Sequence, residues 1–143
     1  MHTKHNVYCI LLLILLLVPN FLSAQTSETL SSKDTLVVLW TSGDPDVAEK
    51  VCLMYTHAAQ RSKWFNHVIL IVWGPSAKLL SENKELQEKV KNMIKDGVQV
   101  QACVVCANSY DVSDDLKNIG IEVFGMGKPL TNYLKTDYSI LNF

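Results

Sequence analysis

Basic charge is scarce in this chain and is gathered nowhere. Its 13 lysines and arginines face 14 aspartates and glutamates, which gives a formal net charge of −1. No stretch of the sequence forms a basic stripe or patch. Proteins that bind nucleic acid or anionic membranes need clustered Lys and Arg to neutralise phosphates. The sequence therefore argues against both classes of partner.

The common catalytic motifs are missing as well. There is no G-x-S-x-G, no Walker loop, no H-E-x-x-H, and no G-x-G-x-x-G after the first predicted strand. Classical hydrolases, nucleotide-binding proteins and zinc proteases are thereby disfavoured. A zinc site needs four ligands, and beside Cys103 and Cys106 the usual donors are Cys52, His57 and His67, none of which shows a paired ligand spacing. We predict neither a metal site nor a cofactor.

Cysteine is too rare for a disulfide scaffold. Of four cysteines, Cys9 lies in an N-terminal apolar run, which leaves Cys52, Cys103 and Cys106 for the folded domain. Three is an odd number and too few to staple a small fold. A local bridge is possible only between Cys103 and Cys106. Cys52 lies in a predicted helix, where a free cysteine packs as a small hydrophobe, and we expect it in the core.

The longest apolar run, Val7–Val18, is short for a membrane span. Its 12 residues fall below the roughly 20 that a spanning helix needs. A weakly positive start precedes the run, Pro19 ends it, and small residues lead to Ala24, which is the layout of a secretory signal peptide. We predict a signal peptide over 1–24, cleavage after Ala24, a flexible leader over 25–34, and one domain over 35–143. The protein should be exported to the periplasm without a stable membrane anchor.

Strand and helix patterns alternate along the rest of the chain. Between the predicted strands, apolar residues recur at helical spacing. One such series predicts a helix that ends at about Lys63, and its members are Val47, Val51, Met54, Tyr55 and Ala58. Apolar, β-branched runs predict five strands at Thr35–Thr41, His67–Trp73, Val98–Cys103, Ile121–Phe124 and Tyr138–Phe143. This alternation predicts an α/β fold, a three-layer α/β/α domain with a mainly parallel sheet of about five strands.

Ligands of such sheets gather beyond the carboxyl ends of the strands. The segment from Ser42 to Asp44 follows the first strand and could cradle an anion at a helix start. A plain turn, with Asp44 as N-cap and Pro45 as the first helical residue, explains it equally well. A second turn on the same edge contains Gly127. We take Ser42, Asp44 and Gly127 as the residues that shape a pocket there.

The pair Cys103 and Cys106 is the strongest chemical signal in the sequence. It lies where the third predicted strand meets a short helix, whose unpaired N–H groups and dipole favour a thiolate. C-x-x-C spacing serves redox chemistry, zinc binding or structure. The intervening Val104 and Val105 are β-branched and apolar, which argues against a thioredoxin fold. Structural burial of both cysteines stays open.

Several positions together carry a family resemblance. The chain has an opening strand, a cysteine that ends the third strand, a strand beginning at Gly120-Ile121, a Met126-Gly127 turn and a closing strand. In these features it resembles the DsrE/DsrF-like family of sulfur-relay proteins. The resemblance implies a small α/β/α domain that forms trimers or hexamers and carries a persulfide on the residue matching Cys103. Two features depart from it: residues 104–113 contain no Lys or Arg, and relay members act in the cytoplasm.

The sequence thus predicts a protein with a reactive cysteine that serves sulfur transfer or thiol redox. Cys103 would attack or carry sulfane sulfur, and Cys106 would resolve it by forming a disulfide. A sulfur-carrier or thiol protein would be the partner. The alternative is a non-enzymatic, oligomeric binding module whose cysteines are structural. An apolar fraction of 48% with three tryptophans also predicts self-association.

Overall fold

The computed structural model describes residues 34–143, so the predicted signal peptide and nearly all of the predicted leader lie outside the described residues. A sheet of five strands runs through the molecule in the order β4-β3-β2-β1-β5, and every neighbouring pair is parallel. The strands are β1 (Thr35–Trp40), β2 (His67–Val72), β3 (Gln99–Cys103), β4 (Glu122–Phe124) and β5 (Ser139–Asn142). The predicted α/β fold and its five strands are confirmed, with slightly shorter bounds.

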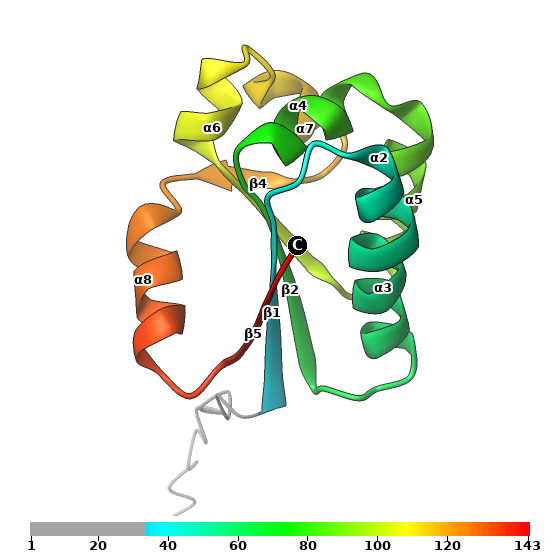
Figure 1. Cartoon of the computed structure of the whole chain (residues 1–143), viewed down its shortest axis with the longest axis vertical. Helices are drawn as coiled ribbons and strands as arrows, with labels where there is room; N and C mark the ends of the chain where they lie inside the picture. The colour runs from blue at the N-terminus through cyan, green and yellow to red at the C-terminus, as the bar shows by residue number, and fades with distance from the viewer. Residues whose placement is uncertain (1–33) are drawn as a thin grey trace, which may run out of the picture.

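Helices cover the two faces of this sheet unequally. In Figure 1, α3 and α5 lie on one face, and α8 lies on the opposite face. The helical elements are α2 (Pro45–Val47), the π-helical turn η2 (Ala48–Leu53), α3 (Met54–Arg61), α4 (Pro75–Glu82), α5 (Lys84–Lys95), α6 (Val104–Ser109), α7 (Ser113–Asn118) and α8 (Gly127–Lys135). None of the helices within 34–143 is long and apolar enough to cross a membrane.

The chain order explains this unequal cover. From β1 to β4 each strand is added beside the previous one, and the chain then returns across the sheet to place β5 beside β1. Crossovers between parallel strands are right-handed. Because the chain crosses the sheet in the reverse direction between β4 and β5, its last helix, α8, lies on the other face. The three-layer arrangement therefore follows from the strand order.

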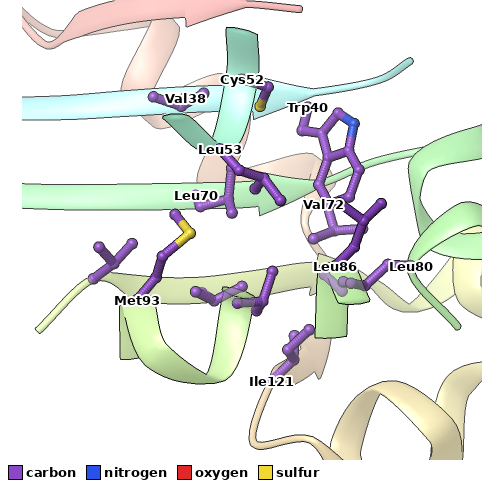
Figure 2. Packing of buried hydrophobic residues seen from close by; sticks show 14 of the residues in the cluster. Val38, Trp40, Cys52, Leu53, Leu70, Val72, Leu80, Leu86, Met93 and Ile121 are labelled. Atoms are coloured by element: carbon purple, nitrogen blue, oxygen red, sulfur yellow. The ribbon is translucent and has the colours of Figure 1, made fainter. Parts of the chain in front are cut away.

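The larger part of the core lies between the sheet and the α3–α5 layer. Val38 and Trp40 of β1 alternate with Val37, because successive strand residues point to opposite faces, and only the first two belong to this larger cluster. Figure 2 shows how the side chains of this cluster pack across β1, β2 and the covering helices; those labelled are Val38, Trp40, Cys52, Leu53, Leu70, Val72, Leu80, Leu86, Met93 and Ile121.

A smaller apolar cluster lies on the α8 side of the sheet. Its buried members are Val37, Ile69, Ile71, Cys103 and Met126. Half-buried side chains from β4, α6, α8 and the loop after β2 complete it, among them Trp73, Cys106, Phe124 and Leu130. One of the two candidate cysteines is thus a buried member of this cluster, and the other packs against it.

The helix after β1 buries a different face from the one that its apolar spacing marks. The buried residues are Ala48, Cys52, Leu53, Thr56 and Ala59. By contrast, Val51 is 42% exposed and Met54 is 61% exposed. The π-helical turn η2 changes the angular register of the helix, since a π turn holds more residues than an α turn. The expected core position of Cys52 is confirmed, and the apolar series through Val51 and Met54 faces outward.

Candidate functional site

Two loops and the start of α6 meet at the carboxyl edge of the sheet. The loop after β1 touches the loop after β2, because a Cβ atom at Gly43 would lie 3.1 Å from the Cβ atom of Pro75. The Ser76 hydroxyl donates to the Trp40 carbonyl over 2.6 Å, and the Trp73 N–H donates to the same carbonyl over 2.9 Å. These bonds fix the loop after β2, which in turn adjoins the cysteine pair.

Cys103 occupies the junction between strand and helix that the sequence predicts. It is the last residue of β3 and the N-cap of α6, and its backbone there is extended, with no side-chain capping bond. Its side chain is 4% exposed and packs in the smaller cluster with the fully buried Met126. Cys103 therefore sits at the sheet edge but beneath its surface.

Cys106 lies one helical turn further on and is half-buried. Burial raises the pKa of the Cys106 thiol, the backbone N–H of Gly74 works in the opposite direction, and a hydrogen bond with Cys103 adds to the rise. The two thiols are in contact and both are free. The structure thus brings the two predicted catalytic cysteines together, with Cys106 nearer to solvent.

Gly74 adjoins the cysteine pair and is not among the site residues predicted from the sequence. Its backbone angles, φ 67° and ψ −133°, are ones that residues with a side chain rarely adopt. This conformation directs its N–H toward the Cys106 sulfur. Its sequence signal is a Gly-Pro pair directly after the predicted strand His67–Trp73. The contact itself cannot be seen in the sequence.

The predicted pocket residues lie on the same edge but make different contacts. The Asp44 carboxylate accepts N–H bonds from Asp46 over 2.8 Å and from Val47 over 3.1 Å, so it caps α2 as predicted. The Ser42 hydroxyl accepts from the Asp44 N–H over 3.1 Å. Gly127 is exposed and begins α8 directly after the buried Met126. Ser42 and Asp44 are thus joined to each other, and Gly127 adjoins the cluster that contains Cys103.

Cys52 lies outside this site, in the larger core cluster. It is fully buried in η2, and its backbone carbonyl accepts from the Thr56 hydroxyl over 2.7 Å. Burial raises the pKa of its thiol to about 12, against a smaller lowering by Thr56. A thiol in that condition is protonated at physiological pH and has no contact with solvent.

The donors for a metal ion do not converge in the described part of the chain. No group of three or more His, Cys, Asp or Glu side chains within residues 34–143 is placed to hold an ion. His57 instead pairs with Asp96, with 2.7 Å between Nε2 and Oδ2. The chemistry that this site can offer with its own residues is that of two adjacent thiols.

Comparison with known proteins identifies relatives of this chain. The sequence model of the DsrE/DsrF-like family matches residues 34–143. A conserved protein of unknown function from Bacteroides thetaiotaomicron, BT1422, is 34% identical and similar in structure, with a TM-score of 0.75 over 77% of this chain and 95% of that one. The YchN protein of E. coli shares the fold at 14% identity, with a TM-score of 0.60 over 78% of this chain and 99% of its own. No curated protein sequence matches.

Proposed function

Because this chain belongs to the DsrE/DsrF-like family, which suggests sulfur relay at the family level, we propose that it handles sulfane sulfur with the thiols of Cys103 and Cys106. The observation that carries the proposal is the contact between these two free thiols at the carboxyl edge of the sheet. Ligand chemistry in parallel α/β sheets is concentrated at that edge. Cys52 takes no part, since it is buried in the core.

Uptake is a thiolate exchange with no net oxidation. The Cys103 thiolate attacks the outer sulfur of a donor persulfide, a new S–S bond forms at Cys103, and the donor's own S–S bond breaks. The donor leaves as a thiolate and takes up a proton from water. An acceptor thiolate that attacks the outer sulfur of the Cys103 persulfide reverses these steps and restores the Cys103 thiolate. Donor and acceptor are thiol proteins or small thiols.

Cys106 provides a second outcome when no acceptor is present. Its thiolate attacks the inner sulfur of the Cys103 persulfide, the persulfide bond breaks, and hydrosulfide leaves. The product is a disulfide between Cys103 and Cys106, so the protein is oxidised by two electrons and the sulfane sulfur is reduced to sulfide. A dithiol reductant then returns both thiols.

The surroundings of the pair support these roles. The N–H of Gly74 faces the Cys106 sulfur and favours its thiolate. Cys103 is 4% exposed, which protects a persulfide from water but requires the loops around it to open for the donor. In this proposal Ser42, Asp44 and Gly127 border the opening. The predicted export to the periplasm and the predicted self-association are retained as parts of the proposal.

A second function has one observation in its favour. The low exposure of Cys103 is also what a structural cysteine shows, and the protein would then be an oligomeric binding module without sulfur chemistry. The two functions differ in whether the folded protein reacts with a sulfane donor at all.

The deciding experiment treats the reduced protein with a low-molecular-weight persulfide and follows intact mass and released sulfide. The wild type should release one sulfide per chain and form the internal disulfide. Cys106→Ser should stop at a stable adduct of one sulfur atom, and Cys103→Ser should bind none. An unreactive wild type would contradict the proposed sulfur chemistry. Uptake by Cys103→Ser together with inert Cys106→Ser would reverse the two roles.

A further inference from the structure

The outward face of η2 and α3 carries an apolar stripe whose two central side chains, Val51 and Met54, are exposed in the described chain. It consists of the exposed Val51 and Met54 and the half-buried Val47 and Ala58, and the exposed Arg61 lies at its carboxyl-terminal end. Val51 is 42% exposed and Met54 is 61% exposed. Large apolar side chains in a row on a surface commonly mark an interaction site.

A groove runs beside this stripe. It lies between η2–α3 and α5, holds about 760 Å³, and has Leu53 and Met93 among the apolar residues that line it. Met54 lines it as well. Methionine is flexible and polarisable, so it adapts to an incoming surface. Stripe and groove together form a surface into which a further helix fits.

The charges along this surface change sign from one end to the other. Its amino-terminal end carries Asp44 and Asp46, and its carboxyl-terminal end carries Arg61 and Lys63. Neither Arg61 nor Lys63 makes an ion pair within residues 34–143. Asp46 pairs with Lys50 over 2.7 Å at the open surface, where such a pair contributes little.

We propose that this η2–α3 surface binds the same surface of a second copy of the chain, with the two helices antiparallel and the two-fold axis near Met54. The antiparallel arrangement places the acidic end of each copy against the basic end of the other and opposes the two helix dipoles. Met54 lies at the middle of the stripe, so the axis brings the two Met54 side chains together and into the grooves. This pairing specifies the self-association that the proposed function includes, and it does not depend on the sulfur chemistry.

The first test is the mass of the assembly, measured by sedimentation on protein expressed from the full chain. Met54→Lys should halve the mass, because the substitution places two like charges at the axis. Leu134→Lys is the matched control, since Leu134 is 64% exposed on α8 and lies outside the surface; it should leave the mass unchanged. A monomeric wild type, or a Met54→Lys protein of unaltered mass, would overturn the proposal.

The second test concerns orientation. Arg61→Glu and Asp46→Lys should each weaken self-association at least tenfold, and the double variant should recover most of the loss because the opposed charges are restored. Circular dichroism melting should show that each variant remains folded. If the two single variants weaken association and the double variant weakens it further, the helices are not antiparallel and the proposed pairing is wrong.

Discussion

The three cysteines within residues 34–143 lie in two environments that differ in nearly every physical respect. Cys52 lies in the larger core cluster with no exposed surface, and burial raises the pKa of its thiol to about 12. Cys103 and Cys106 lie in or against the smaller cluster, at the sheet edge, with their thiols in contact and a backbone N–H directed at one of them. Position alone therefore separates a fully buried thiol from a pair of adjacent thiols at the sheet edge.

The largest effect that this comparison predicts is a difference in alkylation rate. In the folded protein, Cys106 should react with iodoacetamide at least about 10³-fold faster than Cys52, because Cys52 is reached only by an opening that costs several kcal/mol. Peptide mass spectrometry after timed labelling gives both rates in one sample. Labelling in denaturant is the control, in which the two rates should converge. Equal rates in the folded protein would remove the distinction between the two environments.

For stability, the order of the two cysteines should be reversed: substitution of Cys52 should have a larger effect than substitution of Cys106. Cys52→Ser places a hydroxyl in an apolar core and should lower the free energy of unfolding by about 1–3 kcal/mol. Cys106→Ser, at a half-buried site, should lower it by less than about 1 kcal/mol. Urea unfolding of both variants measures the difference. A larger loss for Cys106→Ser would mean that the edge cysteine is the structural one.

How far the sequence anticipates this arrangement depends on the range of the contacts. Local sequence patterns are enough to predict that Cys103 ends a strand and that Asp44 caps a helix, because each position depends on neighbours along the chain. The contact between Gly74 and Cys106 joins the loop after β2 to helix α6, and only the parallel order of β2 and β3 brings them together. The sequence pattern also does not indicate that Met54 faces outward. Helical spacing assumes regular α turns, whereas η2 is a π-helical turn.

Substitution of Gly74 tests whether its backbone N–H favours the Cys106 thiolate at the sheet edge. Gly74→Ala should destabilise the fold by about 1 kcal/mol or more, since φ at this position is 67°. It should also slow alkylation of Cys106, because a displaced N–H no longer favours the thiolate. Gly125→Ala is the matched control: Gly125 does not have a positive φ, and a Cβ atom there meets nothing within 4 Å. Equal effects of the two substitutions would show that the Gly74 N–H does not act on the sulfur.

The smallest expected effect concerns the pH dependence of Cys106. Because burial raises the pKa of this thiol, less thiolate is present at neutral pH, and the alkylation rate should rise with pH to a midpoint above the ordinary thiol value of about 8.5. Cys103→Ser should lower that midpoint, since the Cys103 thiol contributes to the rise. Stopped labelling from pH 6 to 10.5, roughly two units on either side of the ordinary value, gives both curves. A midpoint below the ordinary value in the wild type would contradict this description of the site.

The measurement that tests the account most directly is the location of sulfane sulfur in the folded protein. After brief exposure to a low-molecular-weight persulfide, free thiols and persulfides are trapped, and each cysteine-containing peptide is quantified. In Cys106→Ser protein, where the adduct cannot collapse to a disulfide, the added sulfur should reside on Cys103 and be absent from Cys52. Sulfur spread over both cysteines, or found on neither, would contradict the claim that the sheet edge is the site of sulfur chemistry.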